Sequence, residues 1–137
     1  MILTIDCGNT NTVFALYSYK KNIIEEGCWR INNDSKRTAD LYYPWLIQML
    51  QISNFDLQKI SGVCIASVVP ETLLNIKGFI KKYFKINPLV VGEDIIDFGI
   101  KINIDNPQEA GSDRIVNSYA AKILKFSPAI IIDLGTA

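Results

Sequence analysis

Two short segments near opposite ends of the chain share one pattern of acidic, glycine and hydroxyl residues. The apolar run Ile2–Ile5 leads into Asp6–Thr10, and the apolar run Ala129–Ile132 leads into Asp133–Ala137. Glycine lets the backbone turn tightly and present N–H donors to a phosphate group. An aspartate at the end of a strand can hold Mg²⁺ beside the phosphates. A single Asp-x-Gly segment is equally typical of a tight turn, so the phosphate interpretation depends on the pair.

A second polar group precedes the most regular helical pattern of the chain. Residues 107–114 read Pro-Gln-Glu-Ala-Gly-Ser-Asp-Arg, and a helix is predicted over residues 113–125. In one interpretation, Asp113 caps this helix or favours its dipole, and Arg114 is a surface cation. In the other, Asp113 accepts a proton from a substrate hydroxyl and Arg114 binds a substrate carboxylate through two parallel hydrogen bonds.

The amino-acid composition limits the catalytic mechanisms and the partners that this chain can have. The 137 residues contain no histidine, which excludes Ser-His-Asp and Cys-His catalysis and makes a carboxylate the natural general base. The 14 basic residues balance the 14 acidic ones, so neither nucleic acid nor a membrane surface is expected as the main partner. The three cysteines lack Cys-x-x-Cys spacing and are expected to be buried, reduced thiols. The sequence therefore predicts a soluble, cytoplasmic protein.

The first third of the chain reads as three strands and a helix. Strands are predicted over residues 1–5, 12–19 and 23–31, and their short connections indicate an antiparallel meander. A helix is predicted from Thr38, as its N-cap, to about residue 51. Pro44 lies inside this helix and is expected to kink it, because proline has no N–H to donate.

Strands and helices alternate in the remainder. Residues 61–69 have the length and apolar character of a strand covered on both faces, and Pro70 opens a helix to about residue 84. Short strands are predicted at 89–91 and 100–104, and a buried strand at 129–132 follows the helix at 113–125. This order predicts an α/β fold with a mixed sheet.

Taken together, these motifs resemble one family. Residues 6–16 closely match the opening of type III pantothenate kinases, and residues 107–114 match that family's Pro-x-x-x-Gly-x-Asp-Arg element. Residues 133–137 match its second phosphate motif, and Thr38–Asp40 resembles the start of its first helix. These kinases belong to the actin-like, acetate- and sugar-kinase superfamily, in which two ribonuclease-H-like lobes clamp ATP. The resemblance implies a ribonuclease-H-like lobe over residues 1–128. It implies that residues 129–137 are the first strand and phosphate motif of a second lobe, largely absent from this sequence.

The resemblance also implies a function. It implies a transferase that uses ATP to phosphorylate pantothenate to 4′-phosphopantothenate, the first step of coenzyme A biosynthesis. Mg²⁺ and a monovalent cation, potassium or ammonium, would be needed, and the protein would be a homodimer. The 137 residues alone would be inactive. Two alternatives stay open: a kinase for another small acceptor that carries a carboxylate, and a non-enzymatic regulatory or binding module on the same fold.

The same resemblance assigns roles to individual residues. Asp113 would be the proton acceptor, Asp6 would lie near Mg²⁺, and Asp133 would help to bind the monovalent cation. The residues that would meet ATP are Asp6, Cys7, Gly8, Asn9, Thr10, Asn11, Thr12, Val13 and Thr136. The residues that would touch pantothenate are Gly111, Ser112, Asp113 and Arg114, the last as the anchor of its carboxylate. Family members often carry a tyrosine before the Asn-Pro of the substrate loop, where this chain has Ile104, so one pantothenate contact is expected to differ.

Overall fold

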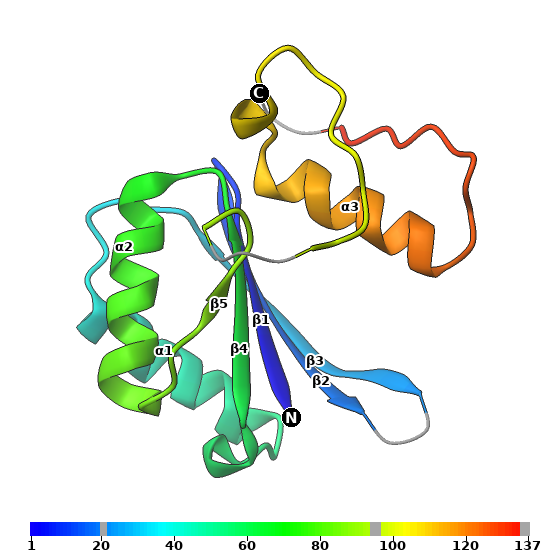
Figure 1. Ribbon diagram of the computed structural model, residues 1–137. Coiled ribbons are helices and arrows are strands. Elements are labelled where there is room, and N and C mark those ends of the chain that lie inside the picture. The colour runs from blue at the N-terminus through cyan, green and yellow to red at the C-terminus, as the bar shows by residue number, and fades with distance from the viewer. Residues whose placement is uncertain (20–21, 94–96, 135–137) are drawn as a thin grey trace.

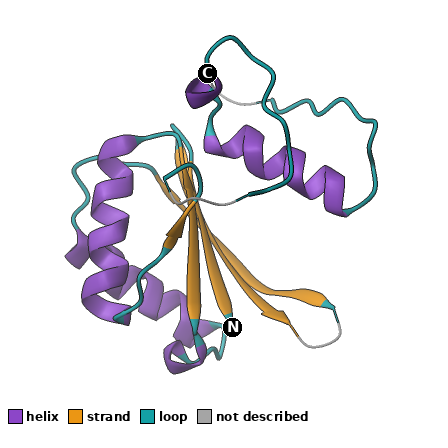
Figure 2. Cartoon of the chain, viewed as in Figure 1, coloured by secondary structure: helices purple, strands orange, loops and turns teal. Residues whose placement is uncertain are grey.

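The computed structural model describes residues 1–19, 22–93 and 97–134, which form one sheet and three α-helices (Figures 1 and 2). The strands are β1 (Ile2–Cys7), β2 (Asn11–Tyr19), β3 (Ile23–Asn32), β4 (Gly62–Ser67) and β5 (Leu89–Val90). The helices are α1 (Ala39–Ile52), α2 (Pro70–Phe79) and α3 (Ser112–Ile123). A π-helical turn, Ile80–Phe84, continues α2, and short 3₁₀ turns occur at Leu57–Lys59 and Pro107–Glu109. Within the described ranges, no helix has the length and apolar character that crossing a membrane requires.

The sheet is mixed, and its strand order is β3-β2-β1-β4-β5. β1 pairs antiparallel with β2, and β2 pairs antiparallel with β3, so the predicted meander is confirmed. β4 runs parallel to β1, and β5 runs parallel to β4. Parallel neighbours need a crossover connection, and α1 lies in the crossover between β3 and β4. The α/β, ribonuclease-H-like prediction of the fold is therefore confirmed.

The core lies between the sheet and the pair of helices α1 and α2, which cover one of its faces (Figure 1). Alternate residues of β1 point to this face: Leu3, Ile5 and Cys7 are at most 2% exposed. Their buried neighbours on the helices include Tyr42, Leu46, Leu50, Ile76 and Phe79. Because side chains alternate along a strand, Thr4 and Asp6 face the other side of the sheet, where α3 lies (Figure 1).

α1 continues through Pro44 from Ala39 to Ile52, so this proline does not end the helix. Pro44 is exposed, whereas Tyr42, Leu46 and Leu50 on the core side are at most 1% exposed. Burial of that apolar face offsets the one hydrogen bond that proline cannot make. Thr38 takes the predicted N-cap position, although its side chain makes no capping hydrogen bond.

Two predicted strands are wrong, namely 129–132 and 100–104, which belong to no strand of the described chain. The side chains of Ile130 and Ile132 are 91% and 76% exposed. A strand is stable only when a neighbour accepts and donates its backbone hydrogen bonds. The described sheet ends at β3 and β5, and neither edge pairs with these residues. Apolar composition alone therefore did not determine a strand here.

The prediction of three buried cysteines is correct only in part. All three thiols are free, but Cys7 is buried, Cys64 is half-buried and Cys28 is exposed. Cys28 lies on β3, at the edge of the sheet, opposite Ala15 of β2. It therefore points away from α1 and α2, to the face that the helix pair does not cover.

Candidate active site

The candidate site lies where β1 and β4 end side by side. Asp6 is the penultimate residue of β1, and its register partner on the parallel strand β4 is Ala66. Both strands end one residue later, at Cys7 and Ser67. The carboxyl ends of parallel neighbours meet at the same edge of a sheet, which is where α/β folds place their ligands. Asp6 therefore stands at that edge on the face opposite the core.

Ser112 fixes the start of α3 to this edge. Its hydroxyl accepts a hydrogen bond from the Ser67 N–H at 2.9 Å and donates one to the Ser67 carbonyl at 2.9 Å. Ser112 is only 7% exposed, and its hydroxyl forms hydrogen bonds within the protein. Asp113 follows directly, in the first turn of α3, and accepts the N–H of Arg114 at 2.8 Å. These two hydrogen bonds bring the second polar motif to the end of β4, which lies beside the end of β1.

Electrostatics connect three aspartates that are far apart in sequence. The pKa of Asp6 is raised above its ordinary value, first by burial of its carboxylate and then by the negative charges of Asp113 and Asp133. The negative charges of Asp113 and Asp133 therefore act on Asp6, although the three residues are far apart in sequence. Carboxylate oxygens are the donors that Mg²⁺ prefers, and a cation would relieve their repulsion. Among the described residues, no group of three or more His, Cys, Asp or Glu side chains is close enough to hold a metal ion by itself.

The first glycine loop is a closed turn between β1 and β2. The Gly8 N–H donates to the Asn11 carbonyl at 2.9 Å, and a Cβ at position 8 would lie only 3.3 Å from that oxygen. Glycine therefore suits this close approach. Asn9 and Thr10, at the tip of the turn, are exposed. The tip is the part of the loop that a phosphate group could reach.

Two residues of this predicted loop point into the protein instead. Cys7 and Thr12 are register partners on β1 and β2, and both are 0% exposed. Burial, with the nearby charge of Asp6, raises the pKa of the Cys7 thiol to about 12, although Ser67 and Thr12 oppose this as hydrogen-bond partners. Their side chains therefore support the loop from the core side, and only their backbone remains for a ligand.

The expected substrate loop precedes α3 as irregular chain with one 3₁₀ turn. A Cβ at Gly111 would collide with the carboxylate of Asp113, so glycine leaves room for that group. Ile104, which stands at the position of the family's tyrosine, is 50% exposed. The side chain of Arg114 is exposed beside Asp113. Thr136 and its neighbours Gly135 and Ala137 lie outside the described residues.

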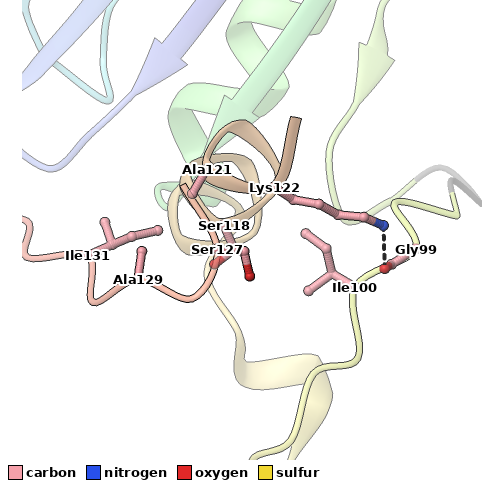
Figure 3. A pocket seen from close by; sticks show the side chains of 8 residues that line it. All are labelled: Gly99, Ile100, Ser118, Ala121, Lys122, Ser127, Ala129 and Ile131. Carbon is pink, nitrogen blue, oxygen red and sulfur yellow. Dashed lines mark hydrogen bonds between the residues drawn. The ribbon is translucent and has the colours of Figure 1, made fainter. Parts of the chain in front are cut away.

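A hollow of about 260 Å³ lies elsewhere, along the later turns of α3 (Figure 3). It is lined by Gly99, Ile100, Ser118, Ala121, Lys122, Ser127, Ala129 and Ile131. Lys122 reaches across and donates to the carbonyls of Gly99 at 2.6 Å and Phe98 at 3.2 Å. None of the predicted site residues lines this hollow, and its cation already has backbone partners. It is therefore not the candidate site.

The sequence did not reveal the residues whose hydrogen bonds support the glycine loop and the start of α3. Ser67 forms two hydrogen bonds with Ser112, and Asn33, which follows β3, contacts the glycine loop and is itself contacted by Thr72 of α2. All three are ordinary polar residues whose partners are 25 to 45 positions away in sequence. Only the strand order could have revealed these contacts, because no local spacing marks them.

The mixed five-stranded sheet and its helices define an α/β fold that is consistent with one lobe of an actin-like ATPase. The sequence model of the type III pantothenate kinase family matches residues 2–137. Type III pantothenate kinases of Paramagnetospirillum magneticum, Phenylobacterium zucineum and Maricaulis maris are 46%, 44% and 40% identical to it over 137 residues. The chain belongs to the type III pantothenate kinase family. These matches cover all of the chain and 52% of each relative, so the chain spans about half the length of the curated relatives it matches.

Proposed function

We propose that this chain is the N-terminal lobe of an enzyme that transfers the γ-phosphoryl group of ATP to the primary hydroxyl of pantothenate. The product would be 4′-phosphopantothenate, and the reaction would open coenzyme A biosynthesis. The observation that carries this proposal is the joint electrostatic site of Asp6, Asp113 and Asp133 beside a glycine turn. Phosphoryl transfer depends mainly on positioning and on neutralising charge, and this arrangement suits both.

The nucleotide would lie over the first glycine turn. Backbone N–H groups and the exposed tip residues Asn9 and Thr10 are suited to contact phosphate oxygens. Asp6 would lie beside Mg²⁺, Asp133 beside a monovalent cation, and Thr136 near a phosphate of ATP. The bound cations would neutralise charge on the phosphates. The pKa of Asp6 is raised first by burial and then by the charges of Asp113 and Asp133, and this supports the assignment because a cation at that place would offset their repulsion.

Pantothenate would lie at the start of α3. Asp113 would accept the proton of the attacking hydroxyl, and Arg114 would bind the pantothenate carboxylate. The first-turn position of Asp113 and the exposed side chain of Arg114 support these roles. Gly111 would give the substrate access to Asp113. The Ser112 hydroxyl would hold the start of α3 through its hydrogen bonds to Ser67, and it would not contact the substrate.

The active enzyme would need a second lobe. We propose that residues 1–128 form the ribonuclease-H-like lobe and that residues 129–137 begin its partner lobe, as the coverage of about half of each relative supports. The exposed apolar side chains of Leu124, Ile130 and Ile132 would be covered there. We further propose that the enzyme is a homodimer in the cytoplasm, a reducing compartment that suits its three free cysteines. We call this chain extended through the second lobe the two-lobed protein.

An acceptor panel tests the proposal. The two-lobed protein would be assayed for ADP release with ATP, Mg²⁺ and potassium, and with pantothenate, acetate or a sugar as acceptor. Pantothenate-dependent ADP release, with phosphopantothenate identified by mass spectrometry, is the expected result. ADP release with acetate or a sugar instead would favour a kinase for another acceptor. A folded protein that binds ATP without transfer to any acceptor would favour the non-enzymatic binding module.

A further inference from the structure

Asn33 connects the first glycine turn to a buried residue of α2. It directly follows β3, and its backbone N–H donates to the Thr10 carbonyl at 2.7 Å. Its side-chain amide donates to the Gly8 carbonyl at 2.9 Å. Its side-chain oxygen accepts the hydroxyl of Thr72 at 2.8 Å. Asn33 therefore contacts both ends of the segment 8–10.

Thr72 orients the asparagine. It is 0% exposed, and its hydroxyl donates to the oxygen of the Asn33 amide. That bond leaves the NH₂ group of Asn33 facing the Gly8 carbonyl. With the amide reversed, two oxygens would meet at Gly8, which is unfavourable. The core thus fixes which group of Asn33 reaches the turn.

These contacts have a consequence for an anionic ligand. A phosphate group is attracted by backbone N–H groups and repelled by carbonyl oxygens. The backbone and side-chain N–H groups of Asn33 bind the carbonyls of Thr10 and Gly8, so those two oxygens are occupied by donors of the protein. The Gly8 N–H closes the turn on Asn11 at 2.9 Å. The conformation of the tip therefore depends on Asn33, a residue that is not part of the turn.

We propose that Asn33, oriented by Thr72, is a positioning residue for the phosphates of the nucleotide. The inference rests on the proposed function, because it takes the first glycine turn as the nucleotide loop. Asn33 touches no reacting atom, and it acts by holding the backbone of residues 8–10. Its loss should weaken nucleotide binding and leave the pantothenate side of the site, at Asp113 and Arg114, unchanged.

The test uses the two-lobed protein and two variants of the relay. Asn33→Ala removes both side-chain bonds, and Thr72→Val keeps the shape of the buried side chain while removing only its hydroxyl. Affinity for a fluorescent ATP analogue with Mg²⁺ would be measured without pantothenate, followed by KM for ATP and for pantothenate. We expect about tenfold weaker nucleotide binding for Asn33→Ala and about threefold for Thr72→Val. KM for pantothenate should stay within about twofold, a split that a general loss of structure would not give.

Asn75→Ala is the matched control. Asn75 lies on the same helix, and its amide donates to the Ser35 carbonyl at 3.0 Å, so it holds the neighbouring segment without touching the glycine turn. This variant should bind the nucleotide like the wild type. Unchanged nucleotide affinity in Asn33→Ala, or equal rises of both KM values, would overturn the inference.

The same measurements separate the inference from the proposed function. Wild-type protein that binds the nucleotide but phosphorylates no pantothenate would overturn the proposed function, while the variants would still decide the role of Asn33. Active wild-type protein with unaffected variants would overturn the inference alone. Absence of nucleotide binding by the folded wild type would overturn both.

Discussion

The described residues up to 93, the first part, and residues 97–134, the second part, differ in how many apolar side chains they bury. Every apolar residue that the structure describes as buried lies between Leu3 and Val91. After residue 97, most large apolar side chains of α3 and the following segment are exposed, and Ile115 is half-buried; the exposed ones are Val116, Tyr119, Ile123, Leu124, Phe126, Ile130, Ile131, Ile132 and Leu134. The first part therefore has its own core. The second part presents an apolar surface and has no comparable core among its described residues.

This contrast shows how the site is assembled. Two hydrogen bonds between Ser112 and Ser67 connect the start of α3 to the first part. A typical hydrogen bond contributes only about 0.5–1.5 kcal/mol. Burial of one large apolar side chain contributes about 1.5–3 kcal/mol. We therefore expect the second lobe, by covering α3, to stabilise the place of Asp113 beside Asp6.

The largest expected effect of a single substitution lies where the two parts meet. Asp113→Asn keeps the size of the side chain and its acceptor oxygen at the start of α3, so the fold should be retained. It cannot accept the substrate proton, and kcat of the two-lobed protein should fall about 10²- to 10³-fold. Asp56→Asn is the control, because Asp56 is exposed at the start of a 3₁₀ turn and is distant from Asp113 in the sequence. Turnover within about twofold of wild type would remove Asp113 from the role of base.

A pair of leucines tests the difference in burial directly. Leu46→Ala, at a site that is 0% exposed on α1, should cost about 2–5 kcal/mol of unfolding free energy. Leu124→Ala, at a site 61% exposed after α3, should cost less than about 0.5 kcal/mol in the 137-residue chain. Urea unfolding measures both. A larger cost for Leu124→Ala in the two-lobed protein would indicate that the second lobe covers this side chain. Equal costs for Leu46→Ala and Leu124→Ala in the short chain would contradict the difference in burial.

Asp6 should make stability depend on pH. Its pKa is raised in the folded state, so the folded chain holds this proton more tightly than the unfolded chain does. Stability therefore falls as pH rises from the ordinary value of 3.8 through the raised value. Asp6→Asn should raise Tm slightly at pH 7 and leave it unchanged well below pH 3.8. A lower Tm at pH 7 would indicate that the charge of Asp6 stabilises the fold.

The smallest effect concerns the thiols. Cys28 is exposed and should react with a thiol reagent at pH 8 at once. Burial raises the pKa of Cys7 to about 12, so only about one thiol in 10⁴ is ionised at pH 8, and labelling should require unfolding. Mass spectrometry of labelled peptides would record both rates. Equally fast labelling of Cys7 and Cys28 would show that the core near the site is open.

The sequence predicted local features well and distant contacts poorly. The first three strands and the helix after Thr38 follow from short apolar runs, turn residues and a helix start signal, which a sequence pattern records. The apolar run at 129–132 carries the same signal as a buried strand, yet a strand also needs a partner, which composition does not record. Asp6 and Asp113 could be proposed from the sequence because glycine neighbours mark them. Asn33 could not be proposed in this way, because its partners lie in the glycine turn and on α2, far from it in sequence.

We propose that these residues form one half of a clamp around ATP. The most direct measurement is a coupled assay with ATP, Mg²⁺, potassium and pantothenate, run in parallel on the 137-residue chain and on the two-lobed protein. We predict turnover by the two-lobed protein and none by the short chain, because one wall of the nucleotide site is missing. Comparable turnover by both would contradict the claim and place the whole active site within residues 1–137.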